Sequence, residues 1–123
     1  MIRVVRLGTP RSKGEGLRIG TVRRPPRGVA KKDFARRNFY DVWFPLLAPS
    51  LPTMKLGLSG DKRFPKKYLA EMARPDASRA IDLLAALSKS ANVSVGCYCE
   101  DESHCHRSLL RELLRSRGAK ILR

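Results

Sequence analysis

The chain has 123 residues, of which 42% are hydrophobic and 7% aromatic, so we expect one globular domain over residues 1–123 and exclude a disordered or fibrous chain. Its 26 Lys and Arg against 11 Asp and Glu give a net charge of +15, which favours anionic partners. No stretch suits a secretion signal or a membrane span, so we expect a cytoplasmic protein without a membrane partner.

The N-terminal third predicts two strands and a basic loop. Hydrophobic residues alternate with other residues over 2–7 and again over 17–22, and we expect two neighbouring strands there. From Arg11 to Arg37, ten Lys or Arg stand against two acids, which is a net +8 of the chain's +15. This segment therefore carries over half of the charge.

The middle of the chain predicts irregular structure followed by helices. The aromatic stretch 39–44 fits either a strand or the wall of a pocket, because its period is ambiguous. We expect turns and irregular chain over 46–60, where prolines and glycines are frequent. Helices are expected from Pro65 through Met72 and from Pro75 through Leu87, since proline is favoured in a first helical turn.

The last third predicts a strand, a helix and a strand. Residues 93–98 suit a buried strand, Ser103 suits the N-cap of a helix running to Arg117, and Gly118 ends that helix before a short strand over 119–122. Such a unit implies parallel pairing. The expected fold class is α/β: a single domain with a mixed, mostly parallel sheet, flanking helices and this C-terminal strand-helix-strand unit.

Chemically capable residues cluster between Cys97 and Arg107. All three cysteines lie within nine residues, which is not a disulfide framework and suits a reducing compartment. The cluster follows a strand and opens a helix, where ligands of α/β sheets bind and where free amides and the helix dipole favour an anion. Ser103, as the N-cap, and Arg107 are the predicted anion-binding residues here.

Helical projection separates the roles within this cluster. His106 falls on the buried face of the helix, with Cys105 and Arg107 flanking that face. Cys99 joins them from the strand end, and a thiol beside histidine and arginine is expected to have a lowered pKa. The predicted catalytic residues are therefore Cys99, Cys105 and His106, although a core histidine bonded to a carbonyl is an equal reading of His106. Cys97 is interpreted as a core residue and left out of the site.

A zinc site is disfavoured by spacing. Three of the donors are consecutive and a second ligand pair is missing, so we predict neither a metal nor a cofactor. A phosphatase signature, with Cys six positions before Arg, is also absent, because Asp101 stands six positions before Arg107.

Two motifs of the chain are distinctive. The C-terminal motif is Cys99-Glu100 followed by Cys105-His106-Arg107-Ser108-Leu109-Leu110. The N-terminal motif combines Gly16-Leu17-Arg18-Ile19, Arg23, Pro26-Arg27-Gly28, Lys31-Lys32 and the segment from Trp43 to Ser50. Together they resemble the YeaO-like family of uncharacterised conserved proteins (domain of unknown function 488), and the match covers most of the chain in order.

The resemblance implies that Arg23, Arg27 and Trp43 meet the Cys-His-Arg segment in one site. Arg23 and Arg27 are accordingly predicted to bind the anion, with Trp43 and Tyr40 as an aromatic wall. The chain departs from the family at Val22, where an acidic residue is usual, and at Pro25, where tryptophan is usual. We therefore expect no role for a carboxylate at this position.

Three functions fit these residues. The first is a site for a phosphate or carboxylate, such as a phosphorylated small molecule, with catalysis by Cys or His left open. The second is a basic nucleic-acid-binding module without catalysis, which uses residues 11–37 and stacks bases on Tyr40 and Trp43. The third is an adaptor in which the cluster only packs and caps a helix. The sequence does not predict an oligomeric state.

Overall fold

The computed structural model describes residues 1–101 and 105–122. Its elements follow in the order β1 (Ile2–Arg6), β2 (Leu17–Gly20), the 3-10 turn η1 (Lys31–Asp33), β3 (Val42–Trp43), the 3-10 turn η2 (Pro45–Leu47), α1 (Leu51–Leu58), α2 (Phe64–Met72), α3 (Pro75–Leu87), β4 (Val93–Cys97) and α4 (His106–Ser116). The predicted α/β class is confirmed. Among the described residues, no helix is both long and apolar enough to cross a membrane.

The four strands form one sheet in the order β1-β4-β2-β3, and all three pairings are parallel. All five residues of β4 are buried, as expected for a strand that is covered on both faces. The prediction that the first two strands are neighbours is wrong, because β4 lies between them. Parallel strands need a crossover rather than a hairpin, and the apolar β4 takes the interior position.

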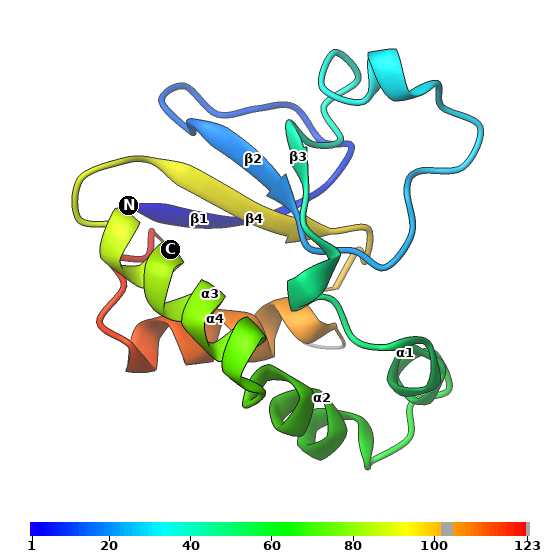
Figure 1. Cartoon of the computed structure of the whole chain (residues 1–123). Helices are drawn as coiled ribbons and strands as arrows, with labels where there is room; N and C mark the ends of the chain where they lie inside the picture. Colours follow the sequence, from blue (N-terminus) through cyan, green and yellow to red (C-terminus); the bar gives the residue numbers. More distant parts are fainter. Residues whose placement is uncertain (102–104, 123) are drawn as a thin grey trace.

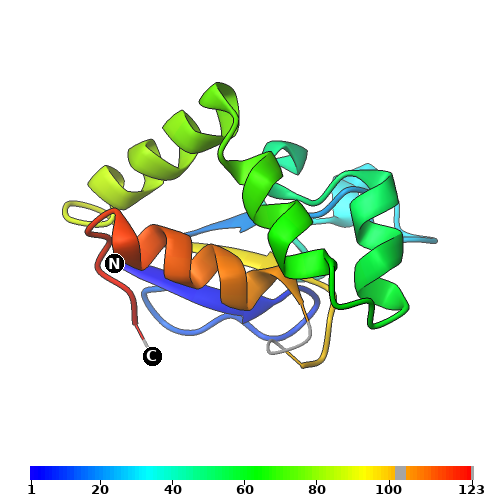
Figure 2. The ribbon, with the colours of Figure 1, turned by 90° about the horizontal axis from the view of Figure 1, so that it is seen from below.

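All four α-helices cover the same face of the sheet (Figure 1). Seen from the helical side, α4 lies along the strands while α2 and α3 cross beside it (Figure 2). Their buried side chains meet those of the strands in one apolar core, which includes Ile2, Ile19, Val95, Ile81 and Leu110. Full burial of such a side chain contributes about 1.5–3 kcal/mol, so this layer is the main source of hydrophobic stabilisation.

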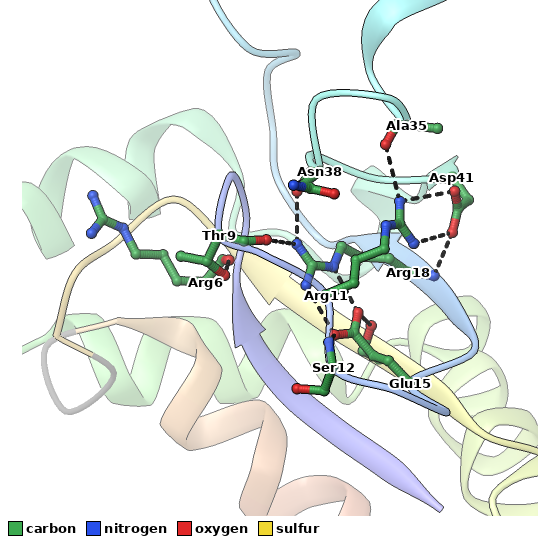
Figure 3. A network of polar contacts seen from close by, with 10 residues as sticks. Arg6, Thr9, Arg11, Ser12, Glu15, Arg18, Ala35, Asn38 and Asp41 are labelled. Carbon is green, nitrogen blue, oxygen red and sulfur yellow. Dashed lines mark hydrogen bonds and ion pairs between the residues drawn. The ribbon is translucent and has the colours of Figure 1, made fainter.

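The other face of the sheet carries a buried polar network under irregular chain. Arg18 of β2 has 0% exposure and donates to both carboxylate oxygens of Glu15 and to the carbonyls of Thr9 and Asn38 (Figure 3). Glu15 also accepts a hydrogen bond of 2.8 Å from Ser94 Oγ on β4. The network therefore ties the loop after β1 to two strands.

The turn-like piece predicted over residues 46–50 is confirmed by the 3-10 turn η2, but the prediction of irregular chain over 52–60 is wrong, since α1 lies there. Pro52 occupies the first turn of α1, where its missing N–H is not needed. The Glu71 carboxylate of α2 accepts hydrogen bonds from the Ser50 amide and from Thr53 Oγ1 at the start of this helix. A partner from the next helix thus stabilises α1.

The C-terminal unit is present in a reduced form. α4 begins at His106 after Cys105, two residues later than the predicted first helical residue, and Ser103 lies outside the described residues. Gly118 follows the helix with φ +84°, a left-handed conformation that glycine adopts readily. The expected last strand is a single parallel bridge between Ile121 and Ile2.

Candidate functional site

A pocket of about 740 Å³ opens at the carboxyl ends of β2 and β4, beside the start of α4. Its wall includes two of the predicted catalytic residues, Cys99 and His106, and two of the predicted anion-binding residues, Arg23 and Arg27. Cys105 borders a second cavity of about 410 Å³ instead. The structure therefore places the main candidates where ligands of parallel α/β sheets bind.

The three cysteines are close together although they come from two elements. Their sulfur atoms all lie within 4.8 Å of one another, and the Cys97 and Cys105 sulfurs are 2.7 Å apart. Cys97 at the end of β4 and Cys105 before α4 are buried, while Cys99 is exposed. Cys97 is a core residue, as predicted, and it also belongs to the sulfur cluster.

The surroundings of Cys99 favour its thiolate. Hydrogen bonds from the Cys105 and Cys97 thiols lower the pKa of Cys99, and the positive charge of Arg107 adds to this against the opposing effect of burial. The hydrogen bond between Cys97 and Cys105, together with burial, raises the pKa of Cys97. The negative charge of the cluster therefore rests on the exposed sulfur.

His106 is buried and neutral at pH 7. Burial lowers its pKa from 6.5 to about 4, although a hydrogen bond to the Thr21 carbonyl opposes this shift. The 2.7 Å contact with that carbonyl requires Nε2 to carry the proton, because a carbonyl only accepts. Nδ1 is then unprotonated and lies 3.5 Å from the Cys105 sulfur. The histidine thus combines the carbonyl bond of a core residue with a lone pair that faces a thiol.

Arg107 lies behind the cysteines and not on the pocket wall. Its side chain is only 4% exposed, and its Nη2 donates to the Cys99 carbonyl at 2.5 Å. Its buried Nε has no hydrogen-bond partner among the described residues. Arg107 therefore holds the backbone of Cys99 and supplies charge to the sulfur cluster from within the protein.

The arginines of the pocket differ in their availability. Arg23 donates from Nε and Nη2 to the carbonyls of Pro49, Pro45 and Ala48, so it clasps the chain before α1. Arg27 and Arg24 are exposed on the wall, and neither is ion-paired with a described residue. The guanidinium of Arg23 is thus already used by backbone carbonyls. The guanidinium of Arg24, a residue that the sequence analysis did not select, is available to a ligand.

The aromatic residues of the pocket are Phe39 and Tyr98, whereas the predicted wall residues lie elsewhere. Tyr40 is buried over Gly20 of β2, and Trp43 is exposed on β3 with its indole N–H bonded to the Val22 carbonyl. Phe39 and Tyr98 meet edge to face with ring centroids 6.3 Å apart. Phe39 belongs to the aromatic stretch 39–44, for which a pocket wall was one of the two predicted roles, and Tyr98 adjoins Cys99 of the C-terminal motif.

The sulfur cluster invites comparison with a metal centre, because three sulfurs this close can share one ion. One feature disfavours a cation there: the buried guanidinium of Arg107 places a positive charge beside the sulfurs, which repels a cation and stabilises an anion.

A family model described as DUF488-N3a, "Active DUF488-N3 subclade", matches residues 2–118. This span includes both motifs from the sequence and every described residue of the pocket. No curated protein and no solved structure matches the chain. The description calls the subclade active and names no reaction.

Proposed function

The chain belongs to the DUF488 family, and from that premise we propose that it is a cysteine-dependent enzyme in which the Cys99 thiolate attacks an anionic ligand. The observation that carries the proposal is the arrangement of the sulfurs: Cys99 is exposed on the pocket wall, while Cys97 and Cys105 are buried beside it, with all three sulfur atoms within 4.8 Å of one another. A stabilised thiolate in an accessible, electropositive place is the form of cysteine that acts as a nucleophile.

The proposed reaction proceeds by covalent catalysis. The Cys99 sulfur forms a bond to the electrophilic atom of the ligand while that atom's bond to the leaving group breaks, and the bonding electron pair departs with the leaving group. Water then attacks the covalent intermediate and returns the electron pair to sulfur. The proton of that water passes to solvent, because Nε2 of His106 is bonded to the Thr21 carbonyl and its Nδ1 faces the Cys105 sulfur at 3.5 Å.

Arg24 and Arg27 hold the negative charge of the ligand in this proposal. Both side chains are exposed at the pocket, whereas Arg23 and Arg107 are occupied with backbone carbonyls. The ligand is therefore a phosphate or carboxylate compound, which agrees with the excess of positive charge on the chain.

Alkylation at pH 6 with iodoacetate, an anion, and with neutral iodoacetamide tests both parts of the proposal. We expect Cys99 to react faster than the thiol of N-acetylcysteine with both reagents, because it is already ionised. We also expect the ratio of the iodoacetate rate to the iodoacetamide rate to be higher for Cys99 than for N-acetylcysteine. Removing Arg24 or Arg27 should lower this ratio by about fivefold each at low salt, since one charge pair at 4 Å is worth about 1 kcal/mol in water.

Mass spectrometry identifies the modified cysteine, with Cys99→Ser as the negative control. Arg79→Ala, on α3 away from the pocket wall, is the matched control for the loss of one exposed arginine. If Cys99 reacts no faster than N-acetylcysteine, the nucleophile is wrong. If Arg24→Ala, Arg27→Ala and Arg79→Ala all leave the same rate ratio, the anion site is wrong.

A further inference from the structure

Resting on the proposed function, we infer that the ligand of the pocket is a nucleotide of a single-stranded nucleic acid, with its base between Phe39 and the prolines of the wall and its phosphates on the adjoining basic segment. Five cations define this basic segment: Arg24, Arg27, Lys31, Lys32 and Arg37. It begins at the pocket wall, and Figure 1 shows the chain of residues 24–38 running from the end of β2 to beyond β3.

Internal pairing separates these five cations from four other basic residues of the same stretch, while the tenth, Lys13, is exposed but lies apart from them in the loop before β2. Four of the ten Lys and Arg between Arg11 and Arg37 serve the fold: Arg11 pairs with Asp41, Arg18 with Glu15, Arg36 with Asp33, and Arg23 bonds to carbonyls. The five residues of the basic segment are all exposed, and none is ion-paired with a described residue. Their charge is therefore available to a polyanion.

The pocket wall suits a flat ligand group, such as a base, that stacks on rings. The wall does not suit a group that is recognised by hydrogen bonds to its edge. Phe39 and Tyr98 supply two rings, and Pro25, Pro26 and Pro49 supply apolar surface. The Tyr98 hydroxyl is already bonded to the Arg24 carbonyl, so it does not read a base. Stacking of a base on an aromatic side chain is worth about 1–3 kcal/mol and tolerates any sequence.

The basic segment and the aromatic pocket wall adjoin each other, and this favours a single strand over a free nucleotide as the ligand. Arg37 lies over the Phe39 ring with its guanidinium carbon 5.9 Å from the ring centroid, so the far end of the basic segment returns to the aromatic wall. A free nucleotide has one phosphate group and leaves most of these cations unmatched. A duplex keeps its bases stacked inside, and extruding one costs a few kcal/mol. A single strand meets the cations and the rings together.

Fluorescence anisotropy with a labelled ten-nucleotide oligothymidylate measures this binding over a range of salt concentrations. Five phosphate contacts predict a slope of about −3.5 for log K against log salt, because each contact on a single strand contributes about −0.7. The double variant Lys31→Ala/Lys32→Ala should reduce the steepness by about 1.4. Lys66→Ala/Lys67→Ala removes the same dipeptide from α2, on the helical side of the sheet, and should leave the slope unchanged.

Alkylation of Cys99 with iodoacetamide in the presence of the oligonucleotide links the strand to the pocket. Saturating oligothymidylate should slow the modification at least tenfold, whereas equal concentrations of thymidine monophosphate, inorganic phosphate or a DNA duplex should not. Binding without protection of Cys99 overturns the inference, as do equal protection by the mononucleotide and equal slopes for the two lysine variants. Fast, anion-selective alkylation without strand binding would overturn only this inference and leave the proposed function standing.

Discussion

Two clusters of buried polar side chains lie on the same sheet and differ in how completely they are paired. In the Glu15 and Arg18 network, near the amino-terminal ends of β2 and β4, all three guanidinium nitrogens of Arg18 donate to described acceptors. At the carboxyl ends, Nε of Arg107 lacks a described partner and Nδ1 of His106 faces only a thiol. Complete pairing stabilises a fold, whereas a buried polar atom without a partner costs stability.

The largest expected effect comes from breaking the fully paired cluster. Glu15→Gln leaves the charge of Arg18 uncompensated in a site with almost no exposure, so we expect a loss of about 3–5 kcal/mol in the free energy of unfolding. Urea denaturation measures this loss. Glu112→Gln is the control, because the side chains of its ion pair with Arg115 are 63% and 42% exposed and it should cost less than about 1 kcal/mol. Equal losses would show that the buried pair is not special.

Acid should destabilise the two clusters over different pH windows. His106 has a folded pKa of about 4 against 6.5 when exposed, because burial disfavours its charged form. Between these values the unfolded chain binds the proton and the folded chain does not, so stability falls as pH drops from 6.5 to 4. For Glu15, burial raises the pKa, but hydrogen bonds from Arg18 and Ser94 outweigh it and lower the pKa to about 2. Its contribution, complete above pH 4.5, is lost between pH 4.5 and 2.

Each window corresponds to about 3 kcal/mol. Unfolding free energies measured every half pH unit separate them. His106→Gln, whose amide can still donate to the Thr21 carbonyl, should flatten the window from pH 6.5 to 4 and leave the lower one. Glu15→Gln should do the reverse. If His106→Gln leaves the upper window as steep as in the parent chain, His106 is not the group that titrates there.

An intermediate effect is expected at Arg107, where charge acts on a sulfur rather than on stability. Arg107→Met removes the guanidinium and should raise the pKa of Cys99, so the pH at which its alkylation rate is half-maximal should move upward. Arg107→Lys keeps a positive charge and should keep this midpoint close to that of the parent chain. Arg11→Met, in the other cluster, removes a cation far from the thiols and should change nothing.

Circular dichroism of each Arg107 variant shows whether the fold is retained before rates are compared. A rate profile of Arg107→Met that coincides with those of the parent chain and Arg11→Met would mean that the guanidinium only holds the Cys99 carbonyl.

The smallest effects should distinguish two buried tyrosines. The Tyr68 hydroxyl donates to the Leu47 carbonyl at 2.8 Å, whereas the Tyr40 hydroxyl has no partner among the described residues. Tyr68→Phe should cost about 1–2 kcal/mol, because it leaves a buried carbonyl without its donor. Tyr40→Phe should stay within about 0.5 kcal/mol of the parent chain. Thermal or urea unfolding measures both, and a larger cost at Tyr40 would indicate an unrecognised partner for its hydroxyl.

Local patterns predicted the elements that depend on near neighbours along the chain. The helices beginning near Pro65 and Pro75, the buried strand before Cys97 and the stop at Gly118 all follow from spacing and backbone preference. The helix α1 was missed because part of its N-terminal capping comes from Glu71, a partner that is not local.

The candidate site divides in the same way. The sequence by itself determined that Cys99, Cys105, His106 and Arg107 gather between a strand end and a helix start, because strand, loop and helix follow one another there. Only the tertiary structure decided that β4 separates β1 from β2, that Arg24 rather than Arg23 offers its charge, and that Phe39 and Tyr98 line the pocket in place of Tyr40 and Trp43. Those outcomes depend on which backbone carbonyls and rings meet across the fold, and contacts between segments distant in sequence leave no periodic signal in the chain.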